Sequence, residues 1–423
     1  MDHGIVYHFD SKYEFYAELD EVLSASDSIT QEADVIPIID TFVGFLTSFQ
    51  DEYLCDTNDL AHAIYKLLDA TVYINYHTYI VQALIRQRAL KTSNPRDLYV
   101  IYCILLFAGK DDIGVLKYIV SVSSNTKDKS KNGVPPAKQS NELVAKLKYE
   151  IANFLGGERC VMAMASLLFE ICRVCRLDGQ DLETFNVTFI SYLLDVVEKT
   201  CDDTDEAFNY TIIRLILAVN EQFMMLQTGQ RAAAEKEGAE QSVIKNNVME
   251  VLIARMGTAK TFGGNLIFML NRTTDPCVQL LILKLLYLIF TTPESYEYFY
   301  TNDLCVLVDV ILRELCDLGD ENEALRHTFL RVLTPLLVNT QLRHNSYKRT
   351  SIHTLLLTML PSRPWKPVNP TTQRLVRRAL IEWWEGVCGE DVAPTLGDDI
   401  GLEGGQVAVT NGKTRTAAVL LGS

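Results

Sequence analysis

The sequence has no apolar run of the length needed to cross a lipid bilayer, which is about 20 residues. It begins with an acidic stretch that lacks the basic and apolar segments of a secretory leader. Most of the ten cysteines, including Cys103, Cys160 and Cys277, lie within apolar segments, where reduced thiols pack like small hydrophobic side chains. These features predict a cytoplasmic protein without membrane insertion.

The alternation of polar and apolar residues that marks a half-buried β-strand is almost absent. Apolar residues instead recur at helical spacing, and short connections with Gly, Pro, Asn and Asp separate the helical segments. The sequence therefore predicts an all-α fold. The predicted helices cover residues 11–23, 32–54, 58–72, 76–90, 95–107, 115–121, 141–155, 158–176, 182–199, 205–226, 240–256, 264–270, 276–290, 302–316, 324–339, 351–359 and 370–386.

Several of these helices carry apolar side chains around nearly their whole circumference, as the segment 302–315 does. A four-helix bundle cannot bury so many enclosed helices, whereas a solenoid places its inner helices between neighbouring repeats. We therefore predict an armadillo/HEAT-like helical-repeat solenoid. With roughly 40 to 47 residues in a repeat, about eight repeats would fill residues 1–388.

Two segments fall outside this pattern. Residues 123–141 are polar and basic and contain Gly133, Pro135 and Pro136, so we expect a mobile loop between repeats. Residues 389–423 are rich in glycine and poor in large apolar side chains, so we expect a disordered C-terminal tail.

Signatures of catalysis and of cofactor binding are missing. The stretch N-G-K-T-R-T near Lys413 lacks the first glycine of a phosphate-binding loop, since Val407 stands at that position. Cys172 and Cys175 have no second Cys or His pair at the spacing of a zinc site, so they are interpreted as core residues. We expect a protein that is not an enzyme and that has no cofactor and no metal.

Charge is distributed unevenly along the chain. Residues 1–60 contain 14 Asp or Glu and a single Lys, whereas residues 324–381 contain ten Lys or Arg and no acidic residue. Such a gradient favours encounter with a partner of complementary charge, although a run of charge is also typical of an ordinary solvated face. The net charge of -15 and the absence of a recognised module argue against nucleic acid, so a protein partner is favoured.

The segment 326–339 predicts a helix with one apolar face. Its opposite face would present His327, Thr328, Arg331, Thr334, Pro335 and Asn339. Exposed amide and guanidinium groups suit the capture of a partner helix or an extended chain, although an ordinary solvated helix face has the same pattern. With the basic residues that follow, the candidate partner-binding residues are Arg331, Asn339, Arg343, Lys348 and Arg349.

Prolines recur at every third residue from Pro361 to Pro370, as in polyproline II segments. This segment could bind an SH3 protein, but a rigid connector between two helices is the favoured interpretation.

Three motifs carry a resemblance to a known family. They are N-D-x-x-V-L-V-D-x-x-L-R-E-L at 302–315, L-R-x-x-x-L-x-V-L-x-x-L-x-x-N-T at 325–340 and Y-K-R at 347–349. This part of the chain resembles the leucine-rich domain of the WISH/DIP/SPIN-ninety family, activators of the Arp2/3 complex. Animal members also carry an SH3 domain and a proline-rich region, neither of which is found here, so the chain is similar to the compact fungal type.

The resemblance implies an armadillo-repeat protein that binds the Arp2/3 complex and activates it without a preformed mother filament. The product would be a linear actin filament, so contact with a filament end would be indirect, and the family implies a place in cortical actin patches. Neither an actin-monomer-binding helix nor an acidic, tryptophan-ended peptide of the WASP kind is evident. Activation would therefore come from holding the complex in its active arrangement. The alternative is an armadillo-type adaptor for another protein.

Asp309 and Arg313 lie one helical turn apart, a spacing that supports an intrahelical ion pair of some tenths of a kcal/mol. We interpret them instead as residues that cap the edge of an enclosed repeat helix or link it to the next repeat, and not as partner contacts.

Overall fold

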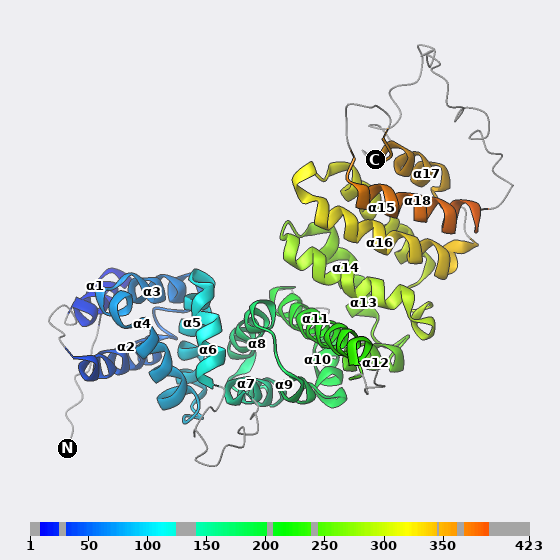
Figure 1. The fold of residues 1–423 in the computed structure, drawn as a ribbon. Helices are drawn as coiled ribbons and strands as arrows, with labels where there is room; N and C mark the ends of the chain where they lie inside the picture. Colours follow the sequence, from blue (N-terminus) through cyan, green and yellow to red (C-terminus); the bar gives the residue numbers. More distant parts are fainter. Residues whose placement is uncertain are drawn as a thin grey trace, which may run out of the picture. The chain divides into compact units, whose positions relative to one another are not determined.

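The computed structural model describes residues 9–24, 31–123, 141–200, 206–237, 244–344, 347–361 and 368–388. The chain forms two compact units that divide between Val251 and Leu252, and each is built from helices (Figure 1). The described ranges contain no β-strand, so the predicted all-α, helical-repeat solenoid is confirmed. Its armadillo or HEAT type and its extent over 1–388 stay predictions. The predicted loop, apart from Ser123 and Asn141, and the tail 389–423 lie outside the described residues.

The first unit is organised around three long helices that contact one another in succession, α5, α8 and α11. Every side chain of α5 from Leu98 to Leu106 is buried, as expected of a helix with neighbours on all sides. The helices of this unit are α1 (Lys12–Ser24), η2 (Glu32–Asp34), α2 (Val35–Phe49), α3 (Thr57–Asp69), α4 (Thr71–Ala83), η3 (Leu84–Ala89), α5 (Pro95–Asp111), α6 (Ile113–Ser123), α7 (Glu142–Ala152), α8 (Gly157–Val174), α9 (Gly179–Glu183), α10 (Val187–Lys199) and α11 (Glu206–Glu237).

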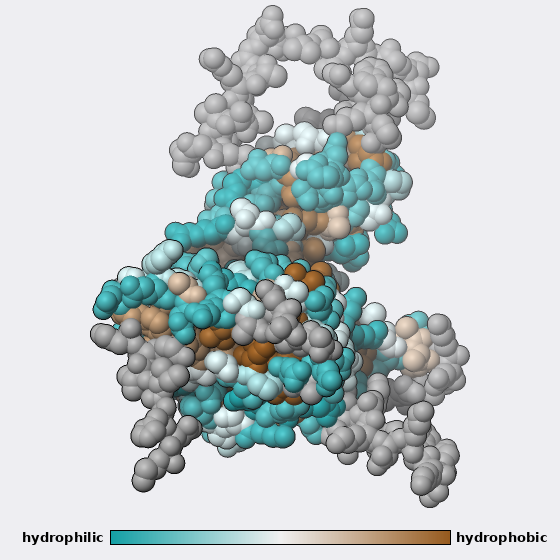
Figure 2. All heavy atoms as spheres, turned by 90° about the vertical axis from the view of Figure 1, so that its left-hand side faces the viewer, coloured by the Kyte–Doolittle hydropathy of each residue, from teal (hydrophilic) through white to brown (hydrophobic). Residues whose placement is uncertain are grey.

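The second unit repeats this arrangement with α14, α16 and α18, each of which contacts the next. Its helices are α13 (Lys260–Arg272), α14 (Pro276–Thr291), η4 (Pro293–Ser295), α15 (Thr301–Asp317), η5 (Asp320–Asn322), α16 (Glu323–Asn339), η6 (Gln341–Arg343), α17 (Arg349–Thr358), α18 (Pro370–Ala379) and η7 (Leu380–Glu385). The boundary between the units falls within α12 (Asn247–Ala254). On the face shown in Figure 2, hydrophilic side chains cover much of the described surface and hydrophobic ones gather in a few places.

Helix α15 contains the enclosed segment that the sequence indicated. Seven of its apolar side chains are buried, namely Leu304, Leu307, Val308, Val310, Ile311, Leu312 and Leu315. Val306 is the exception, with 52% of its surface exposed. Burial of a large aliphatic side chain contributes about 1.5–3 kcal/mol, so α15 is held chiefly by its neighbours.

Three inner helices begin with the same pair of residues, an Asn or Asp followed by proline. Asn94, Asp275 and Asn369 each accept a hydrogen bond from a backbone N–H in the first turn of α5, α14 and α18. Proline fits the next position because a backbone N–H at that point would have no hydrogen-bond acceptor within the helix, so its absence costs nothing. These pairs determine where the inner helices begin.

Several helix predictions were wrong in their bounds, among them those at 182–199, 205–226 and 240–256, of which the last forms a helix at 247–254. The segment 182–199 is divided, because α9 ends at Glu183 and α10 begins after Asn186, whose side chain accepts a hydrogen bond from Phe189 N at 2.9 Å. Helix α11 continues to Glu237, beyond the predicted end at residue 226, through the residues R-A-A-A-E-K-E, most of which favour helix.

The start of α14 gives a test of the capping interaction. Cys277 N donates to Asp275 Oδ1 at 2.8 Å, so Asp275→Ala removes the cap and should lower the free energy of unfolding by about 1 kcal/mol. Asp275→Asn keeps an acceptor and should stay near wild type. Urea unfolding followed by circular dichroism measures both. An Ala variant as stable as wild type would show that the cap contributes nothing.

Candidate functional site

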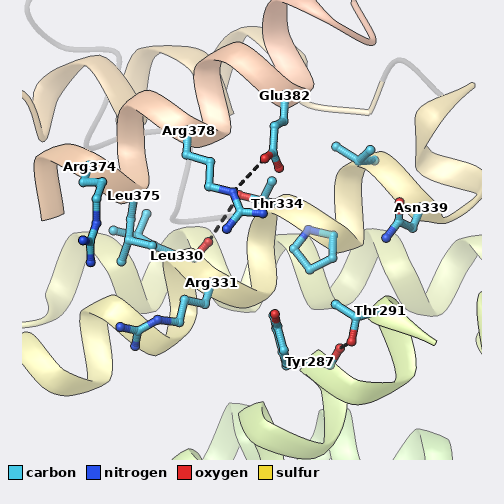
Figure 3. A pocket seen from close by; sticks show the side chains of 12 residues that line it. Tyr287, Thr291, Leu330, Arg331, Thr334, Asn339, Arg374, Leu375, Arg378 and Glu382 are labelled. Carbon is cyan, nitrogen blue, oxygen red and sulfur yellow. Dashed lines mark hydrogen bonds and ion pairs between the residues drawn. The ribbon is translucent and has the colours of Figure 1, made fainter. Parts of the chain in front are cut away.

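A groove in the second unit lies between α14, α16 and the α18–η7 segment (Figure 3). The deeper of its two hollows has a volume of about 380 Å³. The lining residues are Tyr287 and Thr291 from α14, Leu330, Arg331, Thr334, Pro335, Val338 and Asn339 from α16, and Arg374, Leu375, Arg378 and Glu382 from α18 and η7. A shallower hollow of about 590 Å³ adds Pro370, Gln373, Arg377 and Ile381. Since the two hollows share Arg374, Arg378 and Glu382, we call them together the basic groove.

Positive charge dominates this surface. Arg331, Arg374 and Arg377 are exposed, and none of them forms an ion pair with any residue in the described ranges. Arg378 is paired with Glu382, the single acidic residue of the lining, at an Nε–Oε1 distance of 2.7 Å (Figure 3). No carboxylate within the described ranges would have to be displaced from these three arginines by an acidic partner.

Apolar side chains also line the groove. Tyr287 remains 39% exposed, and Ile381 remains 59% exposed at the edge of the shallower hollow. Leu330, by contrast, is almost fully buried. Guanidinium groups beside exposed apolar surface suit a segment with one apolar and one acidic face.

Polar contacts with α16 hold α18 in place beside the groove. The His327 Nε2 and Thr372 Oγ1 atoms lie 2.9 Å apart, and Asn369 Nδ2 donates to Glu323. Burial lowers the pKa of His327. The positive charges of nearby arginines also lower it, whereas the negative charge of Glu323 raises it. A neutral His327 ring is thus favoured beside the Thr372 hydroxyl.

The structure brings together two of the five predicted partner-binding residues. Arg331 and Asn339 both line the basic groove. The expectation that both are exposed was wrong for Asn339, which is half-buried and donates from Nδ2 to Phe290 O at 2.8 Å. Thr334, also predicted on the exposed face, is only 7% exposed because α14 and α18 cover much of that face. Asn339 therefore has a structural task at the end of α14.

The other three predicted residues do not line the basic groove. Lys348 Nζ lies 2.9 Å from Asp309 Oδ1, and Arg349 Nη2 donates to Arg343 O at 3.3 Å. Tyr347 OH donates to Asp309 Oδ2 at 2.8 Å. Burial, followed by this bond and the Asp309 charge, raises the pKa of Tyr347 to about 12. The Tyr347–Lys348 pair thus joins the start of α17 to α15.

Asp309 and Arg313 point to different neighbours and form no pair with each other. Arg313 Nη1 donates to Asn271 Oδ1 at 2.6 Å, which links α15 to α13, while Asp309 links α15 to residues 347–348. The interpretation of these two residues as links between neighbouring helices is confirmed.

Sequence reasoning missed the part of the groove that α14 and α18 contribute. Arg374 and Arg378 are four residues apart in a predicted helix, so their shared face was a readable signal. Tyr287 gave no such signal, since only the packing of α14 on α16 places it there.

Four further features considered from the sequence are a metal site, the Cys172–Cys175 motif, a membrane span and the proline-rich segment. No cluster of three or more His, Cys, Asp or Glu there is arranged to hold a metal ion. Cys172 is a buried free thiol whose pKa is raised by burial, and Cys175 is also free. None of the helices in the described ranges has both the length and the apolar character of a membrane span. Residues 362–367, which hold most of the predicted SH3 ligand, lie outside the described residues, and Pro370 is the first residue of α18.

Comparison with known proteins identifies relatives of this chain. Residues 205–352 match the family model described as "SPIN90/Ldb17, leucine-rich domain". Protein dip1 of Schizosaccharomyces pombe is 30% identical over 363 residues, which are 82% of this chain and 86% of that protein. The chain belongs to the SPIN90/Ldb17 family.

Two further relatives differ in how much of their sequence aligns with this chain. Protein LDB17 of Saccharomyces cerevisiae is 36% identical over 196 residues, 46% of this chain and 37% of that protein. Protein LDB17 of Eremothecium gossypii is 26% identical over 356 residues, 81% of this chain and 74% of that protein. The resemblance to this family noted in residues 302–349 is confirmed, and the matched region contains α14, α15 and α16.

The Asp309 link predicts a stability effect within this matched region. Asp309→Ala removes the acceptor of Tyr347 and the partner of Lys348 and should lower the free energy of unfolding by about 1–2 kcal/mol. Asp317→Ala is a matched control, since this exposed residue lies on the same helix without a described partner. Denaturant unfolding compares the two variants. Equal stabilities would mean that the link does not hold α17 to α15.

Proposed function

We propose that this protein activates the Arp2/3 complex and promotes nucleation of linear actin filaments without a preformed mother filament. The observation that carries the proposal is membership of the SPIN90/Ldb17 family, with 30% identity to dip1 over 82% of the chain. The helical-repeat fold agrees with a binding scaffold, and we propose that the protein is not an enzyme. Its place of action would be the cytoplasm, at cortical actin patches.

The basic groove is the surface that we assign to the complex. A helical, partly acidic element of an Arp2/3 subunit would place carboxylates near Arg331 and Arg374 and apolar side chains near Tyr287. Long-range attraction would raise the rate of encounter, and the bonded groups would set the lifetime of the complex. Because the surrounding helices are close-packed, binding would hold the captured subunit in one orientation, which is how a scaffold can favour an active arrangement.

Actin assembly tests the activity. With pyrene-labelled actin and Arp2/3 complex but no added filament seeds, the purified protein should shorten the lag, and without the complex it should not. Microscopy of the products should show unbranched filaments in the first generation. An unchanged lag at saturating protein would contradict the proposal and would favour an adaptor that binds another protein.

Charge removal in the groove tests the docking surface. Arg331→Gln combined with Arg374→Gln should weaken binding to the complex by about tenfold, or about 1.4 kcal/mol. Both residues are exposed, so the fold should be retained, whereas Asn339→Ala would leave Phe290 O without its donor. A fluorescence titration at two salt concentrations measures the loss.

The matched control removes two exposed charges from the first unit, Lys117→Gln and Arg214→Gln. Wild-type affinity in the groove variant, or equal losses in the two variants, would place the interface elsewhere.

A further inference from the structure

The segment that follows η7 is strongly acidic. Between residues 389 and 412 it contains five acidic residues, Glu390, Asp391, Asp398, Asp399 and Glu403, and no Lys or Arg. Apolar residues stand between the acidic ones, namely Leu396, Ile400 and Leu402. This is the composition that the basic groove is suited to bind, acidic groups interspersed with a few apolar side chains.

The segment also follows η7, whose Glu382 lines the groove. Trp383 of η7 and Cys388, three residues beyond it, are 1% and 4% exposed, so the chain is anchored in the core just before the acidic residues begin. Arg374 precedes Cys388 by fourteen positions, which corresponds to about 21 Å along a helix. Ten residues of extended chain span up to about 33 Å, so Asp398 and Asp399 can reach Arg374.

We propose that the acidic segment 390–403 of this chain occupies the basic groove. Its carboxylates would meet Arg331, Arg374 and Arg377, which have no carboxylate partner in the described ranges. Its apolar residues would pack near Tyr287 and Ile381. A tether this short gives an effective concentration in the millimolar range, so even weak contacts fill the groove within one molecule.

A regulatory consequence rests on the proposed function. The segment and an acidic element of the Arp2/3 complex would compete for the same arginines. If the carboxylates of the segment were replaced by amides, a partner would bind more tightly, because the partner would no longer have to displace the segment.

Photo-crosslinking in the full-length chain tests the contact without any partner protein. With p-benzoylphenylalanine incorporated in place of Leu396, irradiation at low salt should give crosslinks within one chain to peptides of α14, α16 or α18, mapped by mass spectrometry. The yield should fall about tenfold in R331Q/R374Q/R377Q, and similarly when the five acidic residues are replaced by amides. It should also fall at high salt.

The matched control is K91Q/K117Q/R214Q, which removes three exposed charges from the first unit and should leave the yield unchanged. Circular dichroism confirms the fold of each variant. Crosslinks to the first unit, crosslinks solely between two copies, or a yield that the groove variant does not alter would overturn the proposal.

A second measurement addresses the regulatory consequence. The chain with amides at the five acidic positions should bind the Arp2/3 complex several-fold more tightly than wild type. If crosslinks map to the groove but the affinity for the Arp2/3 complex is unchanged, the segment contacts the groove without competing with the complex. If crosslinks map there and the pyrene assay shows no activation, the proposed function fails and the contact is unaffected.

Discussion

The packing of α16 between α14 and α18 determines the positions of the candidate partner-binding side chains. Leu330, Leu333 and Leu336 of α16 are 1% exposed or less, so this helix cannot rotate without opening the core. Directional bonds fix it further, since His327 meets Thr372 of α18 and Asn339 donates to the last turn of α14. The basic groove is therefore part of a rigid helical framework, and its arginines project from surfaces that the core holds in place.

In the second unit, several acidic side chains are bound by neighbouring residues, whereas most arginines of the basic groove face solvent. Several of its acidic side chains are engaged by neighbours: Asp309 by Tyr347 and Lys348, Glu314 by Arg313, and Glu323 by Asn369. Among the groove arginines, Arg378 alone has such a carboxylate within the described ranges. Exposed ion pairs contribute only about 0–1 kcal/mol each, so the lack of a partner from the described helices for these arginines costs the fold little. The result is a local positive surface on a protein whose net charge is -15.

The fold could be predicted from the sequence because helical periodicity and capping residues act locally. The apolar pattern of 302–316 and the Asp–Pro pair at 275–276 placed α15 and α14 within a residue of their observed bounds. The groove could be predicted only in part. A helical face can be read from spacing, which identified Arg331, but what covers that face depends on helices far away in sequence. Asn339 and Thr334 were therefore assigned to solvent, although neighbouring helices cover or bind them. Tyr287 was not identified for the same reason.

The Asn–Pro and Asp–Pro pairs that open α5, α14 and α18 also bear on how such a protein can change in evolution. A residue before proline is restricted to extended backbone, and Asn94, Asp275 and Asn369 have ψ angles of 115°, 109° and 129°. The start of each of these three helices is thus encoded in two adjacent residues, independently of the length of the connection before it. Residues inserted ahead of such a pair would lengthen a loop without sliding the helix past its neighbours. Repeats bounded in this way can acquire insertions between them while the registry of the inner helices is preserved.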